Sequence, residues 1–364
     1  MHVQNLKRWP TVTFGTLGKC ITTTWPYLEQ TRGVFNWIAL DNCVAAAQAH
    51  NMEVFWANDG VPNWAAAETS TCAPLPWAPE VITCTSAVSN VQDITDFFTA
   101  LATRYKGRHL NYELWNEPDG PKFYTGTLAQ MVRMTTAAYN AIRAADPTAR
   151  IFSPSGNTIV WGSTPSYMDD YFAAGGRQVV DVITFHNYPC RYGPEYSAAI
   201  DGVKSVMAKY NLSSTELWNT EGSWGTCSLS IDHQVAFVAR FHLYQWSRGV
   251  RRIYWYQWDN QSWGTLWTSS AGPTAAAIAY QQVYNWMVGT AMTKLCAKQS
   301  DGSTWICELT RPDGTKNLAV WNTAGSKTFV PGGYYKRYRD LAGSTTPIVA
   351  DSVRIGIKPI LLEP

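Results

Sequence analysis

The stretch LNYELWNEPDG, Leu110 to Gly120, decides the fold of this chain. Its first residues form an apolar run typical of a buried strand, and the run ends abruptly at Asn116 and Glu117. The stretch TELWNTEGSW, Thr215 to Trp224, repeats the pattern further along the chain and carries Glu221. Each strand is therefore expected to bring one acid to its carboxyl end, and the two acids form a candidate pair.

Similar strand candidates alternate with helical periodicity along most of the chain. Apolar residues recur every three or four positions between these strands, as in amphipathic helices. The alternation predicts parallel strands joined by right-handed crossovers. The strand candidates lie at 11–17, 52–58, 110–116, 150–155, 179–188, 215–221 and 251–258, and the helical patterns at 39–51, 91–107, 128–146, 197–211, 232–249 and 272–289.

A closed (β/α)₈ barrel needs one strand more than these seven candidates supply. The N-terminal tripeptide MHV, residues 1–3, is the remaining candidate, so we expect a first strand that is short or truncated and a natural start before Met1. The alternative is an open doubly wound sheet, but no Gly-rich phosphate loop follows an early strand. We expect an α/β chain with a TIM barrel over residues 1–289.

After residue 289 the pattern changes to short alternating segments with turn signals such as SDGS and PDGT. Such segments are typical of antiparallel hairpins. The sequence therefore predicts a small C-terminal antiparallel β domain, β-sandwich-like, over residues 290–364.

The composition restricts the partners. Charged residues make up only 15% of the chain and the formal net charge is +2, which argues against nucleic acid because phosphate binding relies on clustered Lys and Arg. No apolar run approaches the ~20 residues that span a bilayer, so we expect no membrane insertion. The chain holds 18 Trp and 19 Tyr. Such a surplus suits a site where flat apolar faces stack on sugar rings, and a Trp-rich core is the alternative.

Eight Cys lie in loop-like, sequence-local positions, which indicates a disulfide framework and an oxidising compartment. Zinc is the alternative, but no CxxC or HxxxH spacing supports it. We expect a secreted protein whose signal peptide is not present in this chain. The candidates are Cys72 and Cys84 around a Pro-rich loop, Cys296 and Cys307 around a turn, Cys190 and Cys227 after strand ends, and the remaining Cys20 and Cys43.

Several motifs together resemble a known group of enzymes. WNEP ends the expected fourth strand, a Glu ends the seventh, HNYP follows at 186–189 and YWYQWDN at 254–260. With the segment at 22–54, these motifs resemble the clan A retaining glycoside hydrolases, family 39 and its endoglycosidase-like relatives in particular. The resemblance covers essentially the whole chain and implies a (β/α)₈ barrel that hydrolyses glycosidic bonds.

The resemblance also implies roles for individual residues. Glu117 would be the general acid/base, kept protonated by burial and by its neighbour's charge. Glu221 would be the ionised nucleophile that forms a covalent glycosyl-enzyme. Asn116 would bind the sugar 2-hydroxyl. We expect a monomer that acts on a β-linked oligo- or polysaccharide and needs no cofactor and no metal.

Further residues are expected to contact the substrate. His186 and Tyr188 are two apart on a strand and so share a face, which places Tyr188 within reach of Glu221 if that face is the lumen. A structural role is the alternative for the histidine. Trp258 resembles the aromatic platform beneath the cleaved sugar. Trp64 and Trp224 are candidates for extra sugar contacts, with packing as the alternative.

One segment departs from the resemblance. Relatives carry an Arg and an Asp near the end of strand two, whereas this chain reads LGKCITTTW from Leu17 to Trp25. Whether Lys19 replaces the Arg that helps to hold the nucleophile is left open. An arabinosidase or transglycosylase, or a catalytically silent carbohydrate-binding barrel, therefore remain as alternatives. The insertion from Asn63 to Ser86 is expected to wall one side of the cleft.

Overall fold

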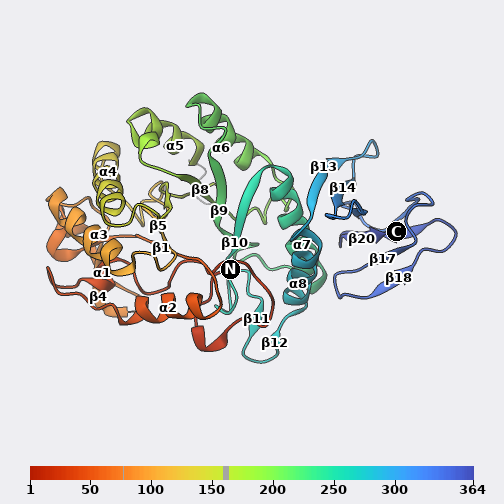
Figure 1. The fold of residues 1–364 in the computed structure, drawn as a ribbon, viewed down its shortest axis with the longest axis horizontal. Coiled ribbons are helices and arrows are strands. Elements are labelled where there is room, and N and C mark those ends of the chain that lie inside the picture. The colour runs from red at the N-terminus through yellow and green to blue at the C-terminus, as the bar shows by residue number, and fades with distance from the viewer. Residues whose placement is uncertain (77, 159–163) are drawn as a thin grey trace.

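The computed structural model describes residues 1–76, 78–158 and 164–364. Its central feature is a sheet of parallel strands surrounded by helices (Figure 1). The short strand β7 (Gly156–Asn157) adds to this sheet beside β8. In spatial order the main strands are β1 (Val54–Ala57), β5 (Leu110–Glu113), β6 (Ile151–Phe152), β8 (Val182–Asn187), β9 (Glu216–Gly222) and β10 (Val250–Trp255).

The N-terminal segment closes this sheet. The backbone N–H of His2 donates to the carbonyl of Trp255 on β10 at 3.0 Å. On the other side Gly18 donates to the carbonyl of Met1 at 2.7 Å, and Lys19 forms a parallel bridge to β1. The N-terminal tripeptide and the segment around Lys19 therefore occupy the first and second strand positions, and the predicted (β/α)₈ barrel is confirmed.

The second strand lies later in the chain than the candidate at 11–17. Leu17 is the first residue of this region whose N–H bonds to the neighbouring strand, at the carbonyl of Glu53. Val12 and Phe14 are buried in the core between sheet and helices. The alternating apolar residues at 11–17 therefore belong to a loop that packs on the barrel, and not to a strand.

The helices follow the predicted periodicity, with two additions. The one-turn helix α1 and α5 were not predicted; α5 begins directly after residues 159–163, which lie outside the described residues. Only the short turn η1 (Leu6–Arg8) stands between the first and second strand positions. The helices are α1 (Trp25–Leu28), α2 (Ile38–Ala49), α3 (Val91–Tyr105), α4 (Leu128–Ala145), α5 (Thr164–Ala173), α6 (Ala198–Lys209), α7 (Ile231–Ser247) and α8 (Ala275–Met287).

The interior of the barrel is filled by side chains from alternate strand positions. Phe55 packs on Phe152 and Tyr254, with ring centroids 5.7 and 5.0 Å apart, and Trp218 completes the layer. Because successive strand residues face opposite sides, residues two apart continue this interior column toward the barrel mouth. The polar residues at the strand ends thus rest on a packed aromatic floor.

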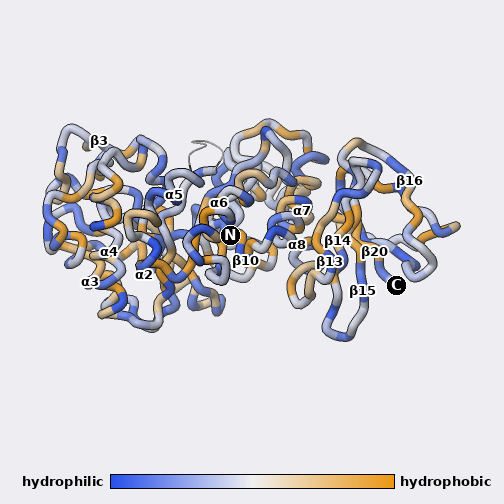
Figure 2. The backbone as a smooth tube through the Cα atoms, turned by 90° about the horizontal axis from the view of Figure 1, so that it is seen from above, coloured by the Kyte–Doolittle hydropathy of each residue, from blue (hydrophilic) through white to orange (hydrophobic). Residues whose placement is uncertain are grey.

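A small antiparallel sheet follows α8, as predicted for the C-terminal region. It packs on α7 and α8, and Figure 2 shows apolar segments of β14 and β20 on that side. A two-stranded sheet of β16 (Lys327–Phe329) and β19 (Val353–Ile355) accompanies it. The main order is β13 (Ala291–Lys298), β14 (Thr304–Thr310), β15 (Lys316–Asn322), β20 (Ile360–Glu363), β17 (Arg337–Arg339) and β18 (Thr345–Pro347).

The insertion after the third strand position forms a sheet of its own. β2 (Val61–Pro62), β3 (Cys72–Leu75) and β4 (Ala78–Cys84) pair antiparallel. Trp77, within this insertion, lies outside the described residues. Thr125, beyond β5, donates its N–H to the carbonyl of Thr85 at 2.8 Å, so the insertion borders the loop that follows the WNEP motif. Another small hairpin, β11 (Trp267–Thr268) with β12 (Gly272–Pro273), follows β10.

All eight cysteines are paired, so the predicted disulfide framework is present. The bonds join Cys20 to Cys43, Cys72 to Cys84, Cys190 to Cys227 and Cys296 to Cys307. In the part of the chain that the structure describes, every helix is too short or too polar to cross a membrane.

Candidate active site

The two acids meet at the mouth of the barrel. Glu117 follows β5, which occupies the fourth strand position, and Glu221 lies near the end of β9, which occupies the seventh. Only 7% and 6% of their surfaces are exposed. A carboxylate oxygen of Glu117 lies within 4.8 Å of one of Glu221. The two strand ends therefore hold their acids face to face in a nearly closed site.

The backbone and two side chains hold Glu117 in place. Its φ is +46°, in the left-handed region that a residue with a side chain adopts only at a cost of about 1–3 kcal/mol, often at functional sites. Its N–H donates to the carbonyl of Ser155 at 2.7 Å. Its Oε1 accepts from Nδ2 of Asn157 at 2.8 Å and lies 2.8 Å from Nδ1 of His186. These two contacts hold the carboxyl group beside Asn157 and His186.

Glu221 is surrounded by donors and cations. Tyr188 donates its hydroxyl to Oε2 at 2.8 Å, and the Lys19 ammonium pairs with Oε1. Burial by itself raises the pKa of this carboxyl, but the charges of Lys19, His186 and His2 outweigh burial and lower the pKa to about 2. Glu221 is therefore a carboxylate over the whole range in which most proteins fold.

Lys19 contacts Glu221 in place of the Arg that the resemblance led us to expect. Besides its ion pair with Glu221, its Nζ donates to Oδ1 of Asn116 at 2.8 Å. Although burial lowers the pKa of this ammonium, the Glu221 charge more than compensates and raises it. Lys19 thus supplies a permanent positive charge from the second strand position and links Glu221 to the amide of the WNEP motif.

His186 and Tyr188 point to the same side, as their spacing predicts. His186 Nδ1 contacts Glu117, and the same nitrogen lies 3.9 Å from Oε2 of Glu221. Burial lowers the pKa of His186, but the charge of Glu221 and the bond to Glu117 more than offset it and raise the pKa. Through His186 and Tyr188, both acids therefore contact the strand at the sixth position.

The predicted tryptophans make packing contacts in the structure. Trp258 is 1% exposed, and its Nε1 donates to the carbonyl of Arg8 at 2.9 Å. Trp224 is buried against Phe237 and Trp255. These contacts are those of packing residues.

The third predicted tryptophan, Trp64, is partly buried near the insertion. It donates Nε1 to the carbonyl of Glu29 at 2.9 Å. The Arg32 guanidinium covers its ring at 4.7 Å. Its ring also meets that of Trp25 edge-on, with centroids 5.9 Å apart.

Tyr256 is an aromatic residue of the site that the sequence analysis missed. It is partly exposed, and the Lys19 ammonium lies 6.0 Å from its ring centroid. Burial first and the Glu221 charge second raise the pKa of its hydroxyl. Its ring also contacts Tyr188 and Trp263 edge-on. The available signal was its position two residues before Trp258, on the same strand end.

Three other polar residues of the site were also missed: His2, Glu113 and Asn157. His2 Nε2 lies 2.7 Å from the carbonyl of Thr220, and burial lowers the pKa of its ring to about 3. Glu113 lies one level deeper in the barrel and is fully buried. For Glu113 the signal was parity, because it lies four residues before Glu117 in the same YELWNEP motif.

Glu117, His186 and Glu221 also offer three ligand atoms within 4.8 Å of one another, a spacing that a metal ion could bridge. The same atoms already have protein partners. Nδ1 of His186 is bonded to Glu117, and the ammonium of Lys19 pairs with Glu221. A cation there would be repelled by Lys19, so we interpret the group as an acid pair with its supports.

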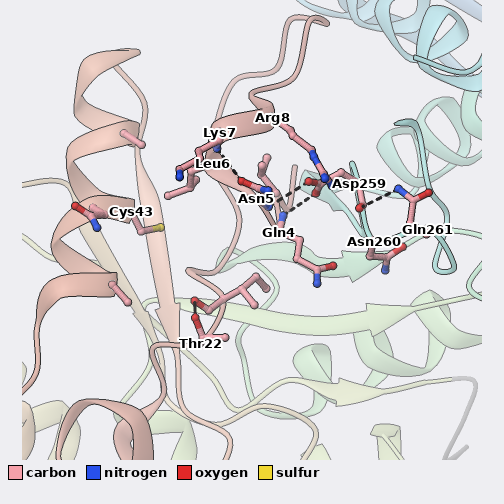
Figure 3. A pocket seen from close by; sticks show the side chains of 15 residues that line it. Gln4, Asn5, Leu6, Lys7, Arg8, Thr22, Cys43, Asp259, Asn260 and Gln261 are labelled. Atoms are coloured by element: carbon pink, nitrogen blue, oxygen red, sulfur yellow. Dashed lines mark hydrogen bonds between the residues drawn. The ribbon is translucent and has the colours of Figure 1, made fainter. Parts of the chain in front are cut away.

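A separate cavity of about 760 Å³ lies beside the barrel (Figure 3). It is lined by residues 3–8, α2 and residues 259–261, where the first barrel helix is replaced by η1. Asp259 accepts from the backbone N–H groups of Gln4 and Asn5 at 2.8 and 3.1 Å. The cavity thus marks the place of a missing helix and lies apart from the acid pair.

Comparisons with known proteins bear on the family and the fold. A family model described as Cellulase (glycosyl hydrolase family 5) matches residues 10–261. No curated protein sequence matches the chain significantly.

Solved structures share the fold at low sequence identity. A family 39 glycoside hydrolase from the gut symbiont Bacteroides cellulosilyticus WH2 has a TM-score of 0.76 at 17% identity, covering 96% of this chain and 75% of its own. A glucosidase from Croceicoccus marinus gives 0.66 at 13%, with 99% and 91% covered. The catalytic domain of a GH30 xylanase C from Talaromyces cellulolyticus gives 0.59 at 15%, with 96% and 88% covered. The resemblance to clan A is confirmed, with family 39 present as a structural neighbour.

Proposed function

Because the chain belongs to the cellulase family, glycosyl hydrolase family 5, it is a glycoside hydrolase, and we propose that it cleaves a β-linked saccharide with retention of configuration. The observation that carries the proposal is the separation of the acids, whose nearest carboxylate oxygens lie within 4.8 Å. Retaining enzymes hold their carboxyl groups about 5–5.5 Å apart, whereas inverting enzymes leave about 6.5–9.5 Å for a water molecule.

In this proposal Glu221 is the nucleophile. Its pKa of about 2 keeps it ionised, and Lys19 and Tyr188 fix its oxygens. Attack on the anomeric carbon forms a covalent glycosyl-enzyme while the glycosidic oxygen leaves. As the charge of Glu221 is consumed, the Lys19 ammonium is free to strengthen its bond to Asn116, which supports the proposed contact of that amide with the sugar 2-hydroxyl.

Glu117 is the proposed general acid and then base. Its Oε1 is engaged by Asn157 and His186, which fixes the plane of the carboxyl group. It protonates the leaving oxygen in the first step. In the second step the resulting carboxylate takes a proton from water, which attacks the glycosyl-enzyme from the face that the leaving group vacated.

The aromatic contact of the cleaved sugar is proposed for Tyr256, because its ring is partly exposed beside Lys19 and Glu221. Stacking on a flat ring orients the sugar and excludes water. The substrate is expected to be an oligo- or polysaccharide, and the four disulfides support secretion into an oxidising medium. We expect the protein to act as a monomer and without nucleic acid partners.

Chemical rescue tests the two assignments. We expect Glu221→Ala and Glu117→Ala each to reduce hydrolysis of an aryl β-cellobioside by at least about 10²-fold. With azide, the Glu221 variant should release the α-glycosyl azide and the Glu117 variant the β-glycosyl azide, because azide replaces the nucleophile in one case and the second-step water in the other. Proton NMR of the products distinguishes the two anomers. Unchanged hydrolysis by either variant would remove that residue from the mechanism.

A panel of β-glucan, xyloglucan and xylan, with product sizes resolved, identifies the responsive polymer. The initial product from that polymer should be the β-anomer, observed by NMR before mutarotation. An initial α-anomer would show inversion and would contradict the proposed covalent intermediate.

A further inference from the structure

We propose that Glu113, a buried acid beneath the catalytic pair, is a positioning residue that acts through His186 to hold a proton donor against Glu117. The inference rests on the proposed function, since it assigns Glu113 to the general acid. It concerns a fully buried carboxyl group of the barrel interior that the proposed mechanism leaves unused.

The geometry places His186 between two glutamates. Its Nδ1 lies 2.8 Å from Oε1 of Glu117, and its Nε2 lies 3.9 Å from Oε1 of Glu113. Within the described residues, neither Nε2 nor this oxygen of Glu113 has another hydrogen-bond partner. Both groups are 0% exposed, where an unpaired polar atom is costly, so each is the natural partner of the other. The separation is in ion-pair range but longer than a direct hydrogen bond.

The other oxygen of Glu113 is already fixed. Thr220 on β9 donates its hydroxyl to Oε2 at 2.6 Å. The titratable groups that act on Glu113 are His186 from β8 and Lys19 from the second strand position, while β1 offers the apolar side chains of Phe55 and Ala57. Thr220 therefore holds the carboxyl group with Oε1 aimed at the imidazole.

The protonation state follows from burial. Desolvation raises the pKa of Glu113 more than His186, Thr220, Lys19 and the Ser155 hydroxyl lower it, so the protonated carboxyl is favoured. Glu113 and His186 face each other across 3.9 Å and share one proton, which lies on Glu113 or, as the raised pKa of His186 favours, on Nε2. In both states the imidazole carries its own proton on Nδ1 and donates it to Oε1 of Glu117.

The Nδ1–H group of His186 determines which oxygen of Glu117 carries the acid proton. With Oε1 accepting from both Asn157 and His186, the acid proton of Glu117 resides on Oε2 and is available to the leaving oxygen. The opposite tautomer would place a lone pair of Nδ1 against Glu117 and draw the acid proton toward the imidazole. Glu113 and His186 share one proton throughout and release none, so the proton that the leaving group receives is that of Glu117 itself.

The test uses two leaving groups. Phenyl β-cellobioside needs protonation of its leaving oxygen, whereas 2,4-dinitrophenyl β-cellobioside departs without it. We expect Glu113→Met to lower kcat/KM for the phenyl substrate by about tenfold or more, and to change that for the dinitrophenyl substrate by no more than about threefold. Glu113→Gln should keep both values within about threefold of the wild type, because its amide donates to Nε2 as the protonated carboxyl does.

Controls separate positioning from packing. Ser153→Ala removes another buried hydroxyl of the barrel interior, which bonds to Thr184 rather than to the acid chain, and should affect the two substrates equally. Equal losses on both substrates for folded Glu113→Met would overturn the inference. A Glu113→Gln variant as impaired as Glu113→Met would also overturn it.

The pH profile of Glu113→Gln keeps the inference testable if Glu113→Met does not fold. The amide cannot pass its proton to His186, and so cannot place an imidazolium beside ionised Glu117. We therefore expect the alkaline limb of kcat/KM for the phenyl substrate to move to higher pH, and an unchanged limb contradicts the inference. Glu117→Gln, measured with both substrates, tests the proposed function separately. If it shows no leaving-group dependence, the acid assignment itself is wrong.

Discussion

At the scale of single residues, the positive charge of Lys19 keeps Glu221 ionised. A buried ion pair is costly to desolvate and stabilises the fold only when further hydrogen bonds satisfy both groups. Here Tyr188 bonds to the carboxylate and Asn116 accepts from the ammonium. Lysine presents a compact point charge, so one nitrogen serves both Glu221 and Asn116, whereas the broader guanidinium of an arginine would need more space.

Removal of this charge should change the pH dependence of catalysis. Glu221 has a pKa of about 2 instead of its usual 4.5, so the ionised nucleophile, and the stability that its ion pair contributes, are lost only as the pH falls toward 2. We expect Lys19→Met to raise this pKa and to produce an acid limb in kcat/KM between about pH 3 and 8, where the wild type has none from this group. Lys19→Arg retains the positive charge, so its acid limb should stay at as low a pH as in the wild type.

Lys209→Met serves as the matched control for this profile. Lys209 pairs with Asp169 at 2.7 Å on the surface, and its side chain is 57% exposed. Its loss should leave the pH profile unchanged. If Lys19→Met also leaves the acid limb where it was, the depressed pKa of Glu221 does not come from Lys19.

The sequence predicted the polar residues of the site better than the aromatic ones. Glu117 and Glu221 end strands, and His186 and Tyr188 follow from strand parity, so period and position are sufficient. The role of Trp258 depended on which side of an irregular strand end faces the mouth. There β10 ends at Trp255, so parity no longer applies, and Tyr256 lies beside the acids instead.

At the scale of elements, a disulfide fixes the loops that leave the catalytic strands. Cys190 follows β8, which carries His186, and Cys227 follows β9, which carries Glu221. The bond joins residues 37 apart in the sequence and closes the loops over the same side of the mouth. The disulfide therefore links the loops after β8 and β9, the strands that carry His186 and Glu221.

The variant Cys190→Ser with Cys227→Ser should lose both stability and activity. A cross-link over a loop of this length is expected to contribute about 3–4 kcal/mol to the free energy of unfolding, measured by denaturant titration. Because the loops border Tyr188 and Glu221, kcat/KM should fall as well. The control is the pair Cys296–Cys307 in the C-terminal sheet, whose loss should lower stability without changing kcat/KM. Equal kinetic effects of both variants would show that the mouth disulfide has no particular role.

Periodicity predicted most strands and helices, because buried strands and amphipathic helices leave clear patterns in the sequence. The segment at 11–17 was misleading, since a loop that packs Val12 and Phe14 alternates as a strand does. The first and second strands are too short for periodicity to define their limits. Their place follows from backbone bonds such as that of Gly18 to Met1.

At the scale of the whole molecule, the C-terminal sheet shares a core with the barrel. The helices α7 and α8 lie beside this sheet (Figures 1 and 2). Leu243 of α7 and Trp286 of α8 belong to one buried cluster with Trp321 of β15 and Leu361 of β20. Continuous apolar contact of this kind is typical of parts that unfold together. The sheet is therefore expected to support the barrel rather than to move freely beside it.

One buried ion pair joins three parts of the molecule. Glu195, in the loop after β8, accepts from Nε and Nη2 of Arg240 on α7, both at 2.6 Å. Its Oε1 also accepts from Nε1 of Trp321 on β15 at 2.8 Å. The side chains of Glu195 and Arg240 are only 9% and 12% exposed. The loop, the barrel helix and the C-terminal sheet thus depend on the same carboxylate.

Removal of this carboxylate should destabilise the whole chain. Glu195→Ala leaves the Arg240 charge buried without its partner and the Trp321 indole without its acceptor, so we expect a loss of about 3–5 kcal/mol in the free energy of unfolding. The matched control is Asp232→Asn, which breaks the exposed pair with Lys358 across the same interface, 3.0 Å long and with side chains 69% and 48% exposed. An exposed pair contributes no more than about 1 kcal/mol. Denaturant titration should show one shifted transition for Glu195→Ala, because barrel and sheet share a core. Two separate transitions, or losses no larger than in the control, would show that the two parts are stable independently.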